Sequence, residues 1–163
     1  MTMNVLFLCT GNSARSILAE ALLNVLGKGR FRAFSAGSHP GGHVQPLAAE
    51  LTTALGYPAE NLRSKSWDEY AVSGAPMMDL IITVCDSAAG AVCPIWPGHP
   101  ATAHWGVTDP APVCGDEATR RRAYTDAYLI LRRRVESLLA LSDDKLRGSK
   151  AGETLRNLAS ATQ

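Results

Sequence analysis

The 163-residue sequence has no excess of charge of either sign, because 16 lysines and arginines stand against 15 aspartates and glutamates. A formal net charge of +1 gives no overall field for holding nucleic acid or an anionic membrane surface. The sequence lacks an apolar run of the roughly 18 residues that a membrane-spanning helix needs. No lysine or arginine precedes its short opening apolar run, whereas a secretion signal has basic residues there. We therefore expect no nucleic acid partner, no membrane partner and a cytoplasmic protein.

Cysteine is scarce, and the sequence has only four such residues: Cys9, Cys85, Cys93 and Cys114. Without a secretion signal, four cysteines are too few for a disulfide scaffold, and they indicate catalytic, redox-active, metal-binding or buried thiols. A zinc site built from two of these thiols with His99 and His104 would lack the short ligand spacing of structural zinc sites. We therefore predict no bound metal.

Segments typical of strands alternate with segments typical of helices along most of the sequence. Short apolar runs predict strands at 3–8, 31–36, 78–84 and 102–105. Apolar residues at helical spacing, with a stop-signal glycine after the first two segments, predict helices at 16–26, 44–55 and 117–141. This alternation predicts an α/β fold, a doubly wound four-stranded parallel sheet with helices on both faces.

The length of the sequence fits a single domain. We expect one catalytic domain at 1–141 and a polar tail at 142–163 that is flexible or forms a short helix. In a doubly wound sheet, ligands bind outside the carboxyl ends of the strands. Cys9, Cys85 and Asp109 each follow a predicted strand, so the fold would bring them to one edge of the sheet.

The loop between the first strand and the first helix reads Cys-Thr-Gly-Asn-Ser-Ala-Arg, from Cys9 to Arg15. Backbone amides of such a loop can converge on one oxyanion, the helix start adds its positive dipole end, and arginine binds two oxygens at once. The same field stabilises a thiolate, so we expect Cys9 to be a nucleophile with a lowered pKa, aided by a hydrogen bond from Ser16. The predicted oxyanion-binding residues are Thr10, Gly11, Asn12, Ser13, Ala14 and Arg15.

Around this loop the sequence resembles the low-molecular-weight protein tyrosine phosphatases and the arsenate reductases that share their fold. The resemblance extends over about 3–141, and its motifs run in the family's order. Besides the loop, they are Ser-Ala-Gly-Ser at 35–38, Arg-Ser-Lys-Ser at 63–66, Thr-Val-Cys-Asp at 83–86, Cys-Pro at 93–94, His-Trp-Gly at 104–106 and Asp-Pro-Ala at 109–111. The resemblance implies the same parallel-sheet fold.

The resemblance also implies that Asp109 is the general acid, which protonates the leaving oxygen while Cys9 attacks. Phosphatases of this family follow the acid with tyrosines that form a wall for an aromatic substrate, whereas this sequence has Ala-Pro-Val at 111–113. Their loop commonly holds a second cysteine, where this sequence has Ser13. Both differences favour an arsenate reductase. The alternative is a phosphatase that hydrolyses phosphotyrosine or small phosphoesters through a Cys9-phosphate intermediate.

Reducing arsenate to arsenite needs two electrons, and a pair of thiols can supply them. By resemblance to thioredoxin-coupled arsenate reductases, Cys85 attacks the Cys9 thiol-arsenate adduct, and Cys93 then forms a disulfide with Cys85. Seven residues separate these two cysteines, one more than in those relatives, so the reductant is either thioredoxin or glutathione with glutaredoxin. We expect no other cofactor and a monomeric protein.

Some relatives bind potassium beside the loop, partly through a carboxylate at the position of Lys65. An ammonium group there can replace the ion, so we expect no potassium, with Asn12 and Ser35 supporting the loop through hydrogen bonds.

The remaining features carry weaker signals. Cys114 matches no motif of the family and is expected to be a bystander thiol. Arginine triplets at 120–122 and 132–134 lie on one predicted helix, and the neutral overall charge favours solvated helix faces over a nucleic acid surface. A different class of function is also open: the same cysteines would suit a non-catalytic sensor of oxyanions or of thiol redox state.

Overall fold

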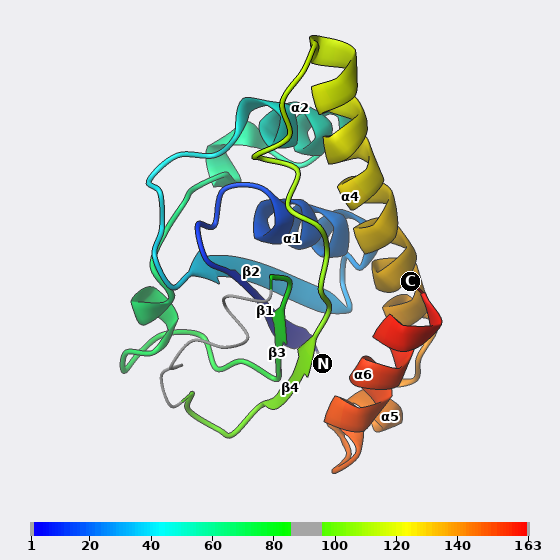
Figure 1. Cartoon of the computed structure of the whole chain (residues 1–163). Coiled ribbons are helices and arrows are strands. Elements are labelled where there is room, and N and C mark those ends of the chain that lie inside the picture. Colours follow the sequence, from blue (N-terminus) through cyan, green and yellow to red (C-terminus); the bar gives the residue numbers. More distant parts are fainter. Residues whose placement is uncertain (1, 86–95, 163) are drawn as a thin grey trace.

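The computed structural model describes residues 2–85 and 96–162, and it contains one sheet of four parallel strands (Figure 1). The strands are β1 (Met3–Cys9), β2 (Phe31–Gly37), β3 (Leu80–Thr83) and β4 (Ala101–His104). Their order is β2-β1-β3-β4, and every neighbouring pair is parallel. The carboxyl ends of all four strands therefore meet at one edge, and the predicted doubly wound parallel sheet is confirmed.

Helices and the sheet share two hydrophobic clusters. The helices are α1 (Arg15–Leu26), α2 (Pro46–Leu55), α4 (Glu117–Leu139), α5 (Asp143–Arg147) and α6 (Ala151–Ala161), with the 3-10 helices η1 (Ala59–Asn61) and η2 (Trp67–Tyr70). On one face of the sheet, Val5 and Phe7 pack with side chains from each of the α-helices just named. On the other face, Leu6 and Leu8 pack with Trp67 of η2. Because successive side chains alternate between faces, a central strand buried on both sides reads as a continuous apolar run.

Helix α4 is fixed at both ends by side chains. It begins after Asp116, whose carboxylate accepts a hydrogen bond from the backbone N–H of Thr119 at 2.9 Å. It ends at Leu139, slightly before its predicted end, where the guanidinium of Arg30 donates to the carbonyl oxygens of Leu139 and Leu141. Arg30 lies 109 positions before Leu139, so no local sequence pattern predicts this contact.

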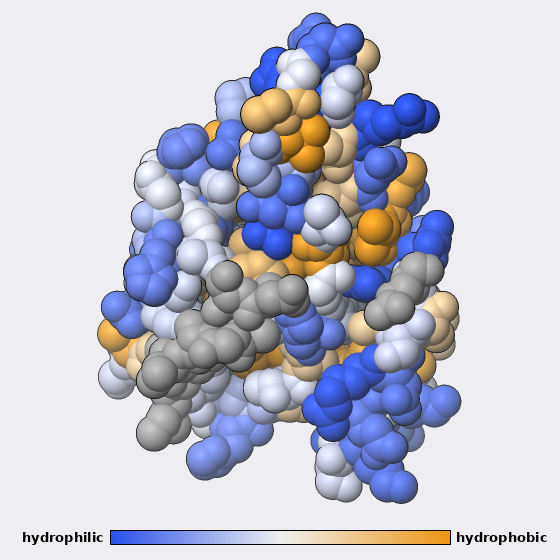
Figure 2. Space-filling view, in the orientation of Figure 1, coloured by the Kyte–Doolittle hydropathy of each residue, from blue (hydrophilic) through white to orange (hydrophobic). Residues whose placement is uncertain are grey.

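The surface around the start of α4, at the top of the view in Figure 2, is mainly hydrophilic. Arg120, Arg121 and Arg122 are exposed there, and Arg121 forms ion pairs with Glu50 and Glu117. This first arginine triplet is therefore a solvated helix face. In the part of the chain that the structure describes, no helix combines the length and apolar character that crossing a membrane requires.

The chain beyond 141 packs against the rest of the molecule through α5 and α6. Leu155 of α6 is fully buried, and its carbonyl oxygen accepts a hydrogen bond from the indole N–H of Trp105 at 3.1 Å. Leu146 of α5 is also buried. Two helices thus occupy the segment for which the sequence predicts a flexible tail or a short helix.

Candidate active site

The carboxyl ends of the strands bring together residues from distant parts of the chain. Cys9 is the last residue of β1, and Cys85 follows β3, with its Sγ accepting a hydrogen bond from the backbone N–H of Thr10 at 3.1 Å. Asp109, beyond β4, forms an ion pair with Arg15, with 3.3 Å between Oδ2 and Nη2. Five of the predicted site residues therefore meet at one edge of the sheet.

Asn12 holds the loop after β1 in shape. Its backbone lies in the left-handed region, with φ of 47°, and its side chain is fully buried. The side-chain amide donates to the hydroxyls of Ser16 at 2.8 Å and Ser35 at 3.0 Å, and its oxygen accepts from the backbone N–H of Lys65 at 2.9 Å. The loop is thereby tied to α1, to β2 and to the segment before η2, in agreement with the predicted support by Asn12 and Ser35.

Gly37 allows β2 to end directly against the same loop. A Cβ atom at this position would lie 2.5 Å from the carbonyl oxygen of Thr10, which is closer than packing permits. The chain that follows continues this contact, because Ser38 donates its N–H to the Cys9 carbonyl at 3.3 Å and His39 donates to the Thr10 carbonyl at 2.9 Å. Any larger residue at this position would displace the loop.

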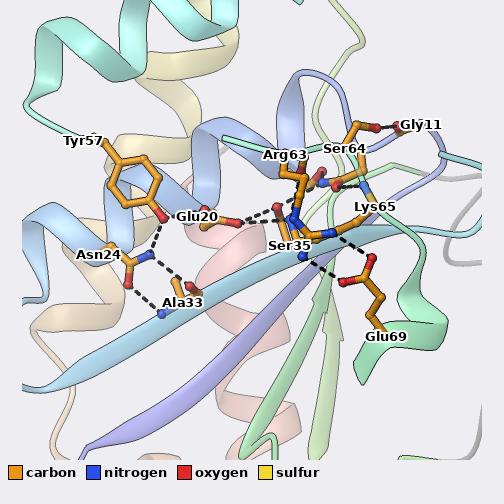
Figure 3. A network of polar contacts seen from close by, with 12 residues as sticks. Gly11, Glu20, Asn24, Ala33, Ser35, Tyr57, Arg63, Ser64, Lys65 and Glu69 are labelled. Atoms are coloured by element: carbon orange, nitrogen blue, oxygen red, sulfur yellow. Dashed lines mark hydrogen bonds and ion pairs between the residues drawn. The ribbon is translucent and has the colours of Figure 1, made fainter. Parts of the chain in front are cut away.

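Behind the loop, a buried carboxylate joins a polar network (Figure 3). Glu20 of α1 accepts hydrogen bonds from the hydroxyls of Ser35 at 2.7 Å and Tyr57 at 2.5 Å. The ammonium of Lys65 lies 3.8 Å from Glu20 Oε1 and donates to the carbonyl oxygen of Arg63 at 2.9 Å. Burial lowers the pKa of Lys65, and the charge of Glu20 opposes this effect. The chain itself therefore supplies a cation and two hydroxyl donors to this carboxylate.

Sequence reasoning misses Glu20 and Tyr57. A signal for Glu20 is present, since it is a charged residue on a helix whose neighbours Leu18 and Ala21 are buried apolar residues. Tyr57 follows the end of α2 and lies 37 positions from Glu20, so its role emerges only from the fold.

Arg15 lies at the rim of the loop with part of its guanidinium unpaired. Its Nη1 donates to the carbonyl oxygen of Val107 at 2.9 Å, and its Nη2 faces Asp109. Its Nε is buried and has no hydrogen-bond partner among the described residues. Ala14, the residue before α1, makes no side-chain cap, and the first N–H groups of a helix have no partner within it. Such N–H groups fit a tetrahedral oxyanion, which can accept from all of them.

The two thiols of the site are buried and interact with each other. Cys85 Sγ accepts from the backbone N–H of Thr10 and lies 3.3 Å from Thr10 Oγ1. A hydrogen bond with Cys85, together with burial, raises the pKa of Cys9 and outweighs the lowering effect of Arg15. The prediction of a lowered Cys9 pKa is therefore wrong for this arrangement. The loop motif contains the groups that lower the pKa but not the neighbouring thiol that raises it.

Asp109 lies on the open side of the loop. Its side chain is 42% exposed, and its Oδ1 accepts a hydrogen bond from the backbone N–H of Ala111 at 3.0 Å. This turn holds the carboxylate beside Arg15, where it can reach a bound oxyanion. Cys114, further along the same segment, is exposed and has its Sγ 3.5 Å from the carbonyl oxygen of Pro112.

The roles of Ser16 and Cys93 stay predictions. Ser16 is fully buried and its Oγ accepts from Asn12, which leaves the hydroxyl hydrogen for another acceptor such as Cys9. Cys93, the predicted last member of the cysteine relay, lies outside the described residues. Within residues 2–85 and 96–162, no cluster of histidine, cysteine, aspartate or glutamate side chains could hold a metal ion.

Comparison with known proteins agrees with this geometry. Residues 4–148 match the family described as low molecular weight phosphotyrosine protein phosphatase. The chain belongs to this family. The match contains the helices from α1 to α5 and the sheet except for Met3, whereas α6 lies beyond it.

Several proteins that are similar to this chain are named arsenate reductases. The arsenate reductase of Bacillus cereus (strain G9842) is 38% identical over 107 residues, which cover 66% of this chain and 76% of the relative. The solved arsenate reductase of Archaeoglobus fulgidus DSM 4304 is 31% identical, with a TM-score of 0.59 over 81% of this chain and 98% of that one. A thioredoxin-dependent arsenate reductase of Corynebacterium glutamicum is 25% identical, with a TM-score of 0.59 over 85% of this chain and 62% of that one.

Proposed function

We propose that this chain is a thiol-dependent arsenate reductase that converts arsenate to arsenite. The hydrogen bond between the buried thiols of Cys9 and Cys85 beside the anion loop carries this proposal. Hydrolysis of a phosphoester needs one nucleophilic thiol and water, whereas reduction of arsenate needs two thiols that can reach each other. The similar proteins named arsenate reductases support the same activity.

The first step joins arsenate to Cys9. The oxyanion binds the amides of loop residues 11–15 and the unpaired Nε of Arg15, while the N–H of Thr10, also predicted to bind it, donates to Cys85. The oxyanion takes the proton of the Cys9 thiol. The Cys9 thiolate, with Ser16 donating to its sulfur, attacks arsenic, so that a sulfur–arsenic bond forms as an arsenic–oxygen bond breaks. Asp109 gives its proton to the leaving oxygen, which departs as water.

The second step reduces arsenic. The Cys85 thiolate, stabilised by the N–H and hydroxyl of Thr10, attacks the Cys9 sulfur of the adduct. A disulfide forms, the sulfur–arsenic bond breaks, and its electron pair stays on arsenic, which leaves as arsenite. Cys93 then attacks Cys85 and releases Cys9, and the resulting Cys85–Cys93 disulfide is reduced by thioredoxin, or by glutathione with glutaredoxin.

The proposed reaction uses no metal or organic cofactor. The ammonium of Lys65 supplies the positive charge beside Glu20, so activity should not depend on potassium. We further propose that the enzyme works as a monomer in the cytoplasm, where such thiol reductants are found.

Arsenite formation by the purified protein tests this function. Arsenate is supplied in parallel with a thioredoxin system or with glutathione and glutaredoxin, and para-nitrophenyl phosphate hydrolysis is measured beside it. We expect continuous arsenite production with one of the two donors. Cys85→Ser should abolish it and retain phosphoester hydrolysis, whereas Cys114→Ser, which changes an exposed thiol, should behave as the parent. Rapid hydrolysis without arsenite would instead establish the phosphatase alternative.

A further inference from the structure

Helix α4 contains an arginine that does not face solvent. The second arginine triplet, at 132–134, is expected to be a solvated helix face, and Arg133 is indeed exposed. Arg134 is only 3% exposed and lies on the same side of the helix as the buried Leu131 and Leu138. The predicted solvated face is therefore wrong for this residue, because a rotation of about 100° per residue turns it into the core.

The buried guanidinium of Arg134 has little to compensate its charge. Its Nη1 donates to the carbonyl oxygen of Gly106 at 3.0 Å, while its Nε is buried without a hydrogen-bond partner in the described residues. In the same part of the chain no carboxylate forms an ion pair with it. Burial and the charge of Arg133 lower its pKa. Because an apolar side chain of similar size would fill this place at less cost, packing alone does not explain an arginine here.

The carbonyl that Arg134 binds belongs to a peptide unit held at both ends. The N–H of that unit, on Val107, donates to the carbonyl oxygen of Val84 at 3.1 Å, while its C=O, on Gly106, accepts from Arg134. Since a peptide unit is planar, these two bonds fix its orientation. The next carbonyl, that of Val107, accepts from Nη1 of Arg15 at 2.9 Å. Two successive carbonyls thus bind two guanidinium groups from different helices.

This segment also leads to the catalytic acid. It runs from the end of β4 past α1 toward the start of α4 (Figure 1). Asp109 follows Val107 by two positions and pairs with Nη2 of Arg15. A shift of the peptide between Gly106 and Val107 would therefore move both the acceptor that orients Arg15 and the loop that holds Asp109.

We propose that Arg134 is a positioning residue that fixes the Gly106–Val107 peptide and thereby sets the geometry of Arg15 and Asp109. The roles of Arg15 and Asp109 rest on the proposed function. Among the described residues, the side-chain hydrogen bond of Arg134 goes to Gly106 and not to the oxyanion loop, so its effect would be transmitted through the backbone of the segment after β4.

Three variants test this role. Arg134→Met removes the charge and the donor but keeps a long side chain, Arg134→Lys keeps a charged donor, and Arg133→Met is the matched control at the exposed neighbour. Inorganic phosphate affinity is measured by calorimetry, and kcat is measured for aryl phosphates with good and poor leaving groups. Urea unfolding is followed for every variant.

We expect Arg134→Met to unfold at the same or a higher urea concentration than the parent, because a buried charge is removed. It should bind phosphate about tenfold more weakly. Its kcat should fall about tenfold more for poor leaving groups than for good ones, since only the poor ones need the proton of Asp109. Arg134→Lys should recover part of both losses, and Arg133→Met should match the parent.

Two results would overturn the role of Arg134. Either Arg134→Met keeps the phosphate affinity and the leaving-group dependence of the parent, or it fails to fold, which would make Arg134 a purely structural residue. Phosphate affinity does not depend on arsenate turnover. If the parent protein forms no arsenite, the proposed reductase function is refuted. The phosphate measurements would still decide the role of Arg134.

Discussion

Arg15 and Asp109 form an ion pair across the mouth of the anion loop, with 3.3 Å between Nη2 and Oδ2. Arg15 stands at the start of α1 and Asp109 in the segment after β4, so the pair joins two ends of the site. A bound oxyanion needs the same guanidinium. We therefore expect the carboxylate and the oxyanion to compete for Arg15, and binding of substrate to free Asp109, the proposed acid, to approach the leaving oxygen.

Asp109→Asn separates these two effects because it keeps the size of the side chain and removes its charge and proton. We expect kcat for arsenate reduction to fall about 100-fold, since the leaving oxygen loses its proton donor. The Kd for phosphate should stay the same or decrease, because Arg15 loses a competing anion. Steady-state kinetics and calorimetry measure the two quantities. Asp116→Asn, at the exposed start of α4, is the control, and an unchanged kcat in Asp109→Asn would argue against the acid role.

Cys85→Ala should make Cys9 more acidic. The hydrogen bond with Cys85 is the largest cause of the raised pKa of Cys9, and the charge of Cys85 raises it further. Without Cys85, the lowering effect of Arg15 remains, so Cys9 should be alkylated by iodoacetamide at lower pH than in the parent. Peptide mass spectrometry resolves Cys9 from the other thiols, and Cys114→Ser serves as the matched control. An unchanged pH profile would show that the two thiols titrate independently.

Glu20→Leu should destabilise the fold by leaving the buried Lys65 without its carboxylate. We expect the free energy of unfolding to fall by about 3–5 kcal/mol, whereas Tyr57→Phe, which removes one hydrogen bond to the carboxylate, should cost about 1.5 kcal/mol. Adding Lys65→Met to Glu20→Leu should recover part of the loss, because the buried charge then disappears as well. Urea unfolding provides the measurement. Simple additivity of the Glu20 and Lys65 effects would contradict the coupling between them.

Tyr70→Phe should change the stability of the protein only at alkaline pH. Burial raises the pKa of Tyr70 from 10.0 to about 12. Between these values the unfolded chain has lost the phenol proton and the folded chain keeps it, so stability falls as pH rises from about 10 to about 12. The phenylalanine keeps the ring contact with Phe34, whose centroid lies 5.4 Å away, and should reduce this loss. Urea midpoints near pH 8 and pH 11 test the difference, and a parallel decline in parent and variant would refute it.

The sheet and the anion loop could be predicted because their signals are local. The apolar run of β1 reflects burial on both faces of the sheet, and the loop from Cys9 to Arg15 carries its chemistry within a few residues. The parallel arrangement then places Cys85 and Asp109 at the same edge, since each follows a strand.

The interactions that tune the site could not be predicted, because they join residues that are distant in sequence. Tyr57 reaches Glu20 only after α2 and α1 pack together, and Arg134 reaches Gly106 only after α4 lies beside the end of β4. The predicted direction of the Cys9 pKa shift is wrong for the same reason, since the shift depends on the thiol of Cys85, which follows β3.

The most direct test of the reductase mechanism is a single turnover in a Cys93→Ser variant without any external thiol. This variant stops the relay at its first disulfide. After addition of arsenate, mass spectrometry of the unreduced protein should show a Cys9–Cys85 disulfide, formed in equal amount to the arsenite released. Arsenite released without this disulfide, or a variant that binds arsenate and forms neither product, would contradict the attack of Cys85 on the Cys9 adduct.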